Sequence, residues 1–93
     1  MSSIPTKFKF KEYEKAIYKI ASNKSLILNK ENKSGSGRRY EVFEITKDNS
    51  RKLKGFWVVH EDKYIYTRDM IKCLPHLEIT KDELVSVLEE IQI

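Results

Sequence analysis

Basic side chains cluster in the middle of this 93-residue sequence, in and after its glycine-rich segment. Lysine and arginine neutralise phosphate groups, and arginine also forms paired hydrogen bonds with phosphate or stacks on bases. This pattern predicts a surface that binds a polyanion. The residues that we expect to form it are Lys33, Arg38, Arg39, Arg51, Lys52 and Lys54.

Aromatic residues in the same region could add stacking to these charged contacts. Where single-stranded nucleic acid lies on a β-sheet, exposed aromatic side chains hold its bases. The candidates for such stacking, or for contact with a protein partner, are Tyr40, Trp57, Tyr64 and Tyr66. The same side chains would also suit a hydrophobic core, and the sequence leaves the burial of Trp57 open.

A second chemistry to consider is RNA cleavage without a metal. It needs a base for the 2′ hydroxyl and cations for the phosphate, and small toxin-type ribonucleases build such sites from His, Tyr, Arg and Lys on a sheet. His60 or His76, with Tyr64, Tyr66 and Arg68, could supply these groups. The competing interpretation of His60 is an ordinary surface residue at the end of a strand.

Two stretches resemble the strand patterns of toxin families. GRRYEVFEI with the later KYIY resembles RelE-type toxins, and GFWVVHEDKYIYT with a C-terminal leucine helix resembles HicA-type toxins. The Gly-Ser-His element of the HicA type is absent, and residues 1–37 correspond to neither family. We therefore assign no family, and a toxin-like ribonuclease stays the second alternative function.

No motif in the sequence predicts a metal ion, a cofactor or a catalytic residue. Cys73 and His76 stand three positions apart, but Pro75 lies between them and no second pair completes a tetrahedral set. The run SGSG at residues 34–37 lacks the spacing and the Lys-Ser/Thr ending of a phosphate-binding P-loop. We therefore expect a protein that is not an enzyme and that binds neither metal nor cofactor.

The net charge of +4 hides an asymmetry along the chain. Residues 1–59 hold 14 basic and 6 acidic side chains, whereas residues 60–93 hold 4 basic and 8 acidic ones. A basic N-terminal part and an acidic C-terminal part are typical of a protein with a surface that binds a polyanion. They are also compatible with a dipolar molecule that has no such function. The single Cys73 and the lack of a signal peptide or membrane span predict a cytoplasmic protein without membrane contact.

A β-meander between Arg38 and Thr67 must position most of these residues. Its expected strands are rich in β-branched and aromatic residues, and polar turns separate them. Apolar residues occur on both faces, which predicts either an exposed apolar binding face or a central strand covered on both sides. Gly55 marks a bulge or a close backbone approach. All expected strands together cover Lys7–Phe10, Ser25–Leu28, Tyr40–Thr46, Leu53–His60 and Tyr64–Thr67.

The last third of the chain carries helix signals. Thr67 is expected to cap a short helix over Arg68–Leu74, which Pro75 ends. Thr80 and Glu83 form a capping box that predicts the start of the final helix.

These signals predict one α+β domain over residues 1–93. Apolar spacings of three and four predict an amphipathic helix of ten to twelve residues from about Lys11, with Asn23 as its left-handed C-cap. We expect the helices to pack on a mainly antiparallel sheet of four or five strands, in the order β-α-β-β-β-β-α-α. A flexible loop rich in Gly, Ser and Lys is expected at residues 29–37.

The function that these features favour is that of a small, basic, non-enzymatic binding protein. Its expected partner is nucleic acid or a protein that handles nucleic acid. The first alternative is a protein-interaction module or inhibitor, of the kind encoded by phages and mobile elements, without direct nucleic-acid contact. A homodimer through an open sheet edge is a further expectation.

Overall fold

The structure is a computed structural model that describes residues 4–32 and 35–92. None of the helices in this described part is long and apolar enough to span a membrane. In chain order the elements are β1 (Lys7–Lys9), α1 (Phe10–Asn23), β2 (Ile27–Asn32), β3 (Gly37–Ile45), β4 (Arg51–His60), β5 (Tyr64–Tyr66), α2 (Thr67–Met70), the 3-10 turn η1 (Ile71–Cys73), α3 (Leu74–Leu77) and α4 (Lys81–Gln92).

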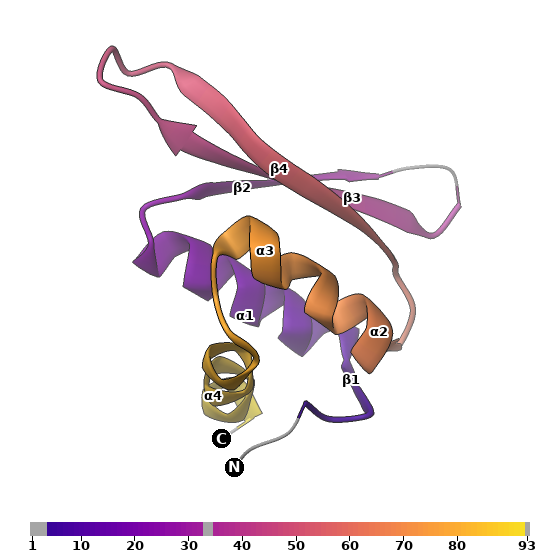
Figure 1. Cartoon of the computed structure of the whole chain (residues 1–93). Helices are drawn as coiled ribbons and strands as arrows, with labels where there is room; N and C mark the ends of the chain where they lie inside the picture. The colour runs from indigo at the N-terminus through magenta and orange to yellow at the C-terminus, as the bar shows by residue number, and fades with distance from the viewer. Residues whose placement is uncertain (1–3, 33–34, 93) are drawn as a thin grey trace.

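Five antiparallel strands form two small sheets. One sheet has the order β2-β3-β4, and the other pairs β1 with β5. All helices lie on one side of the three-stranded sheet, with α1 and the α2–α3 run beneath it and α4 farther away (Figure 1). The α+β class and the order β-α-β-β-β-β-α-α are confirmed.

The predicted meander is wrong in its last strand. The segment expected to follow β4 in the meander, β5, pairs with the N-terminal β1 instead. The reason is burial: Phe8 of β1 lies opposite Ile65 of β5, and both side chains point into the core. The true meander is β2-β3-β4, and β3 is its central strand.

The first helix ends later than predicted. Asn23 is still helical, and the left-handed residue is Ser25, with φ of 59°. The amide of Leu26 donates to the Ala21 carbonyl, and that of Ser25 donates to the Ser22 carbonyl. This is the Schellman arrangement, and it delivers the partly buried Leu26 to the core. The following strand therefore begins at Ile27, two residues later than predicted.

The loop predicted over residues 29–37 is shorter in the structure. Residues 29–32 belong to β2, and Gly37 begins β3. The two strands pair from Ile27 opposite Phe43 to Asn32 opposite Arg38. Polar residues are tolerated in β2 because it is an edge strand, and the edge that is not paired with β3 faces solvent.

Pro75 does not end the helix that precedes it. It lies in the first turn of α3, where a missing amide hydrogen has no cost. Thr67 is the first residue of α2 rather than its cap, and its hydroxyl donates to the Pro5 carbonyl at 2.7 Å. The capping box is confirmed: the Glu83 amide donates to Thr80 Oγ1, and the Thr80 amide donates to Glu83 Oε1.

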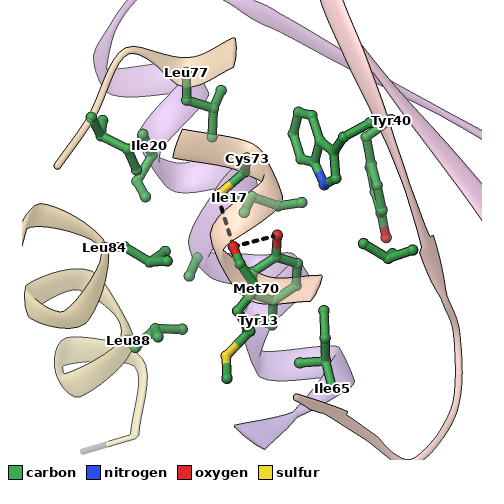
Figure 2. Close-up of a cluster of buried hydrophobic side chains, with 14 of the residues drawn as sticks. Tyr13, Ile17, Ile20, Tyr40, Ile65, Met70, Cys73, Leu77, Leu84 and Leu88 are labelled. Atoms are coloured by element: carbon green, nitrogen blue, oxygen red, sulfur yellow. Dashed lines mark hydrogen bonds between the residues drawn. The ribbon is translucent and has the colours of Figure 1, made fainter. Parts of the chain in front are cut away.

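The core lies between the helices and the inner side of both sheets. Figure 2 shows α1, the α2–α3 run and α4 contributing side chains to one cluster. The Tyr13 hydroxyl and the Cys73 thiol both donate to the Met70 carbonyl at 3.3 Å. Burial raises the pKa of the Cys73 thiol to about 11, so it stays protonated at neutral pH and acts as core filling.

Candidate nucleic-acid interface

The β1–β5 pair presents lysines and tyrosines on one face. Side chains alternate along a strand, so the inward pair of Phe8 and Ile65 leaves the flanking residues on the outer face. Lys7 lies opposite Tyr66, and Lys9 lies opposite Tyr64. Together with two adjacent lysines they form what we call the lysine–tyrosine face: Lys7, Lys9, Lys11, Lys63, Tyr64 and Tyr66.

The two tyrosines of this face differ in exposure and contacts. Lys7 Nζ lies 4.4 Å from the centroid of the Tyr64 ring, and Lys63 Nζ lies 5.6 Å from it. These cation–π contacts hold the two ammonium groups beside a half-buried ring. Tyr66 is 56% exposed, the highest value among the large apolar side chains that the structure describes. Its ring is thus the one open to stacking.

The lysine–tyrosine face carries more positive than negative charge. Across the described ranges 4–32 and 35–92, none of its four lysines has a carboxylate oxygen within the 4.0 Å of an ion pair. Lys9, Lys11 and Lys63 line a surface hollow of about 310 Å³ together with Asp62. The Asp62 carboxylate accepts a hydrogen bond from the Lys63 amide at 2.7 Å. The hollow therefore has a surplus of positive charge.

Backbone hydrogen bonds hold the lysine–tyrosine face in place at both ends. The Phe10 amide donates to the Lys63 carbonyl at 3.1 Å, and the Thr67 amide donates to the Thr6 carbonyl at 3.2 Å. Strands β1 and β5 also run directly into α1 and α2. A short strand pair gains its rigidity from these continuations, because two strands alone are marginally stable in water.

The predicted pair Arg38 and Arg39 is divided between the two faces of the sheet. The two residues are adjacent on β3, so their side chains point to opposite faces of the sheet. Arg38 Nε lies 2.9 Å from Glu61, and its Nη1 donates to the Gly35 and Gly37 carbonyls. The Arg39 guanidinium lies 3.8 Å above the centroid of the Phe56 ring. Its Nη2 also lies 3.2 Å from the Glu41 carboxylate.

The remaining predicted cations lie elsewhere. Arg51 and Lys52 are exposed at the start of β4, next to the hairpin turn. Lys54 Nζ forms an ion pair with Glu78 at 2.9 Å. Lys33 lies outside the described residues. The strand geometry and local ion pairs therefore distribute the five described cations over different parts of the sheet surface.

Two of the four predicted stacking residues are buried. Tyr40 and Trp57 stack on each other with ring centroids 5.4 Å apart, and His76 covers the other side of Trp57 at 5.8 Å. The Tyr40 hydroxyl donates to Glu14 at 2.6 Å. Both aromatic residues lie on the inner face of the sheet, so no ligand can stack on them. Tyr64 and Tyr66 remain as candidates.

The two histidines considered for RNA cleavage have different contacts in the structure. His60 lies 2.8 Å from the Ser36 hydroxyl at the surface, while His76 stacks on Trp57. Within the part of the chain that the structure describes, no hydrogen bond links either histidine to Tyr64, Tyr66 or Arg68. The same part holds no group of three or more His, Cys, Asp or Glu side chains arranged for a metal ion.

None of the four lysines of this face was predicted from the sequence, although Lys7 and Lys9 carry a signal there. Their signal is the alternation KFKF at residues 7–10, which places both lysines on one side of a strand. The alternation does not indicate which strand pairs with this one. Only the pairing with β5 brings Tyr64 and Tyr66 beside them.

The fold and this face define a small α+β protein with a basic, tyrosine-bearing surface. Comparison with known protein families, with curated proteins and with solved structures found no match for the chain.

Proposed function

We propose that this protein binds single-stranded nucleic acid through the lysine–tyrosine face and acts without catalysis. The observation that carries the proposal is the gathering of four lysines, none of which forms an ion pair within the described residues, around two tyrosines. Cations whose charge is not compensated nearby keep their attraction for phosphate and release counterions when they bind it. The buried, unpaired Cys73 suits the reducing cytoplasm, which is the location that we propose.

The geometry of the face suits an extended single strand. Lys7 and Lys9 are two residues apart on β1, which corresponds to ~6.6 Å along the strand. This spacing is comparable to that of successive phosphates in an extended strand, so both ammonium groups can bind one backbone. A base can then stack on the exposed Tyr66 ring, which would not reach a base inside a duplex.

The proposed binding is weakly selective for sequence. A lysine ammonium acts as a point charge and lacks the planar fork that reads base edges. Stacking on tyrosine tolerates every base, because each base has a π face. We therefore expect similar affinities for RNA and DNA strands of mixed sequence, and weaker binding to duplexes.

Fluorescence anisotropy with labelled single-stranded and duplex oligonucleotides tests this proposal. The decisive variant is Lys7→Gln with Lys9→Gln, and the matched control is Arg51→Gln with Lys52→Gln, which removes the same charge from another part of the surface. Loss of two phosphate contacts should reduce the slope of log affinity against log salt by about 1.4. Tyr66→Ala should weaken binding by ~1–3 kcal/mol without changing that slope.

The control pair separates this site from general attraction to a basic protein. If both double variants weaken binding equally, net charge and not the lysine–tyrosine face determines the affinity. If only the control pair weakens it, the site lies near the β3–β4 hairpin. No binding at low salt would refute the proposal as a whole.

A further inference from the structure

The three-stranded sheet has one face that none of the described helices covers. Figure 1 shows all helices on the other side of β2-β3-β4. Four large apolar side chains on strands β3 and β4 are between 41% and 48% exposed: Ile45, Leu53, Phe56 and Val58. We call the uncovered side of the sheet the open sheet face. Exposed apolar side chains gathered on one face mark contact with another macromolecule.

The strand register gives the layout of this face in rows across the sheet. The central row is Ile27, Phe43 and Leu53, from β2 through β3 to β4. On one side of it lies the row Ile45 and Arg51. Two rows lie on the other side of the central row. The nearer one consists of Asn29, Glu41 and Phe56, and the farther one consists of Glu31, Arg39 and Val58.

The charges of the open sheet face balance. Arg39 and Arg51 are matched by Glu31 and Glu41, although the whole chain carries +4. A polyanion would therefore find no net attraction here, in contrast to the lysine–tyrosine face. Two copies of the face can therefore pack against each other without bringing a net charge of one sign into the interface.

We propose that the open sheet face binds a second copy of this chain, as a symmetric dimer of stacked sheets. A two-fold axis that runs across the strands at the central row places Phe43 and Leu53 against the same residues of the partner. Rotation about this axis exchanges the neighbouring rows, so Arg51 of each copy faces the row of Glu41 and Phe56 in the other. Arginine thereby meets a carboxylate and an aromatic ring of the partner.

The size of the face predicts a reversible dimer. Between Arg39 and Ile45 the sheet offers roughly 300 Å² of flat area, from about 4.8 Å between strands and about 3.3 Å per residue, because β2 is paired only as far as Phe43. A standard interface takes ~800 Å² from each partner, so this contact belongs to the weak class. We expect dimers at tens to hundreds of micromolar protein and monomers below.

Sedimentation velocity of the full chain, without nucleic acid, tests the dimer from low micromolar to millimolar concentration. Leu53→Ser with Phe56→Ser should raise the dissociation constant more than tenfold, because both side chains leave the apolar contact. The control Tyr18→Ser removes an exposed apolar side chain from α1, on the helix side of the sheet, and should leave dimerisation unchanged.

A cysteine variant keeps the proposal testable if the serine variant folds poorly. Leu53→Cys lies next to the proposed axis and should form a disulfide between two copies under mild oxidation, whereas Tyr18→Cys should not. A monomer at every concentration overturns the proposal. A dimer that the Leu53 and Phe56 changes leave intact also overturns it and points to the open edge of β2.

Discussion

At the residue scale, Gly55 shows how one position fixes the packing between sheet and helices. The sequence prediction of a bulge or a close approach is confirmed on both counts. The β3–β4 register shifts next to Gly55, and a Cβ atom at this position would lie 2.4 Å from Nδ1 of His76. The absent side chain lets His76 lie flat against Trp57, with 8° between the ring planes. The stack then covers the core side of β4.

Gly55→Ala is therefore expected to destabilise the protein by about 1–3 kcal/mol, because the new methyl group must displace His76. Urea denaturation followed by the fluorescence of Trp57 measures this change. In the background of His76→Ala the same substitution should cost less, since the ring that it meets is gone. An equal loss in both backgrounds would show that His76 is not the cause.

At the scale of elements, a group of charged side chains links α1 to the three-stranded sheet. Lys30 on β2 contacts Glu14 on α1 at 2.7 Å and Glu61 after β4 at 3.1 Å. Arg38 on β3 completes the group through Glu61. The hydrogen bond from Lys30 is the main cause that lowers the pKa of Glu61, and Arg38 adds to it. Glu61 thus joins two strands in its ionised form.

This arrangement predicts a stability that falls on the acid side. Because the folded pKa of Glu61 is below its unfolded value, its contribution is present above about pH 4.3 and is lost as pH falls through the folded value. Glu61 is partly exposed, so we expect Glu61→Gln to cost about 1 kcal/mol at neutral pH. Urea denaturation from neutral to acid pH should show the two proteins converging.

The exposed Glu89→Gln on α4 is the matched control for this measurement, since it removes one carboxylate with no ion pair within the described ranges. The free energy of unfolding of this variant should differ little from that of the natural chain at every pH. A Glu61→Gln difference that does not shrink in acid would rule out the ionised carboxylate as its source.

At the scale of the whole molecule, the two proposed surfaces belong to different sheets. The lysine–tyrosine face lies on the β1–β5 pair and carries a surplus of positive charge. The open sheet face lies on β2-β3-β4 and has balanced charge. In Figure 1, β1 lies on the helix side of the three-stranded sheet, away from the open side. One chain can therefore use both surfaces at once.

The two surfaces should respond differently to salt. With four lysine–phosphate contacts, raising NaCl from about 50 to about 200 mM should weaken single-strand binding by roughly 50-fold. Dimerisation should change by less than about threefold, because burial of apolar area is not screened. Fluorescence anisotropy measures the affinity for the single strand, and sedimentation velocity in the same buffers measures the dissociation constant of the dimer. Equal salt sensitivity would contradict the assignment of a charged and a neutral surface.

The sequence by itself determined the features that depend on neighbouring residues. The apolar stripe of α1, the capping box of Thr80 and Glu83, and the alternation of the strands could be predicted because hydrogen bonds and side-chain periods of three to five residues produce them. From these features the α+β class and the order of elements followed.

Only the tertiary structure decided which charged and aromatic side chains are free. Arg38 is paired with a carboxylate 23 positions away, and Tyr40 with one 26 positions away, so both are used inside the fold. Lys7 became a candidate because β1 pairs with β5, far along the chain. Such pairing depends on which strands bury Phe8 and Ile65 together, and local patterns carry no information about that choice.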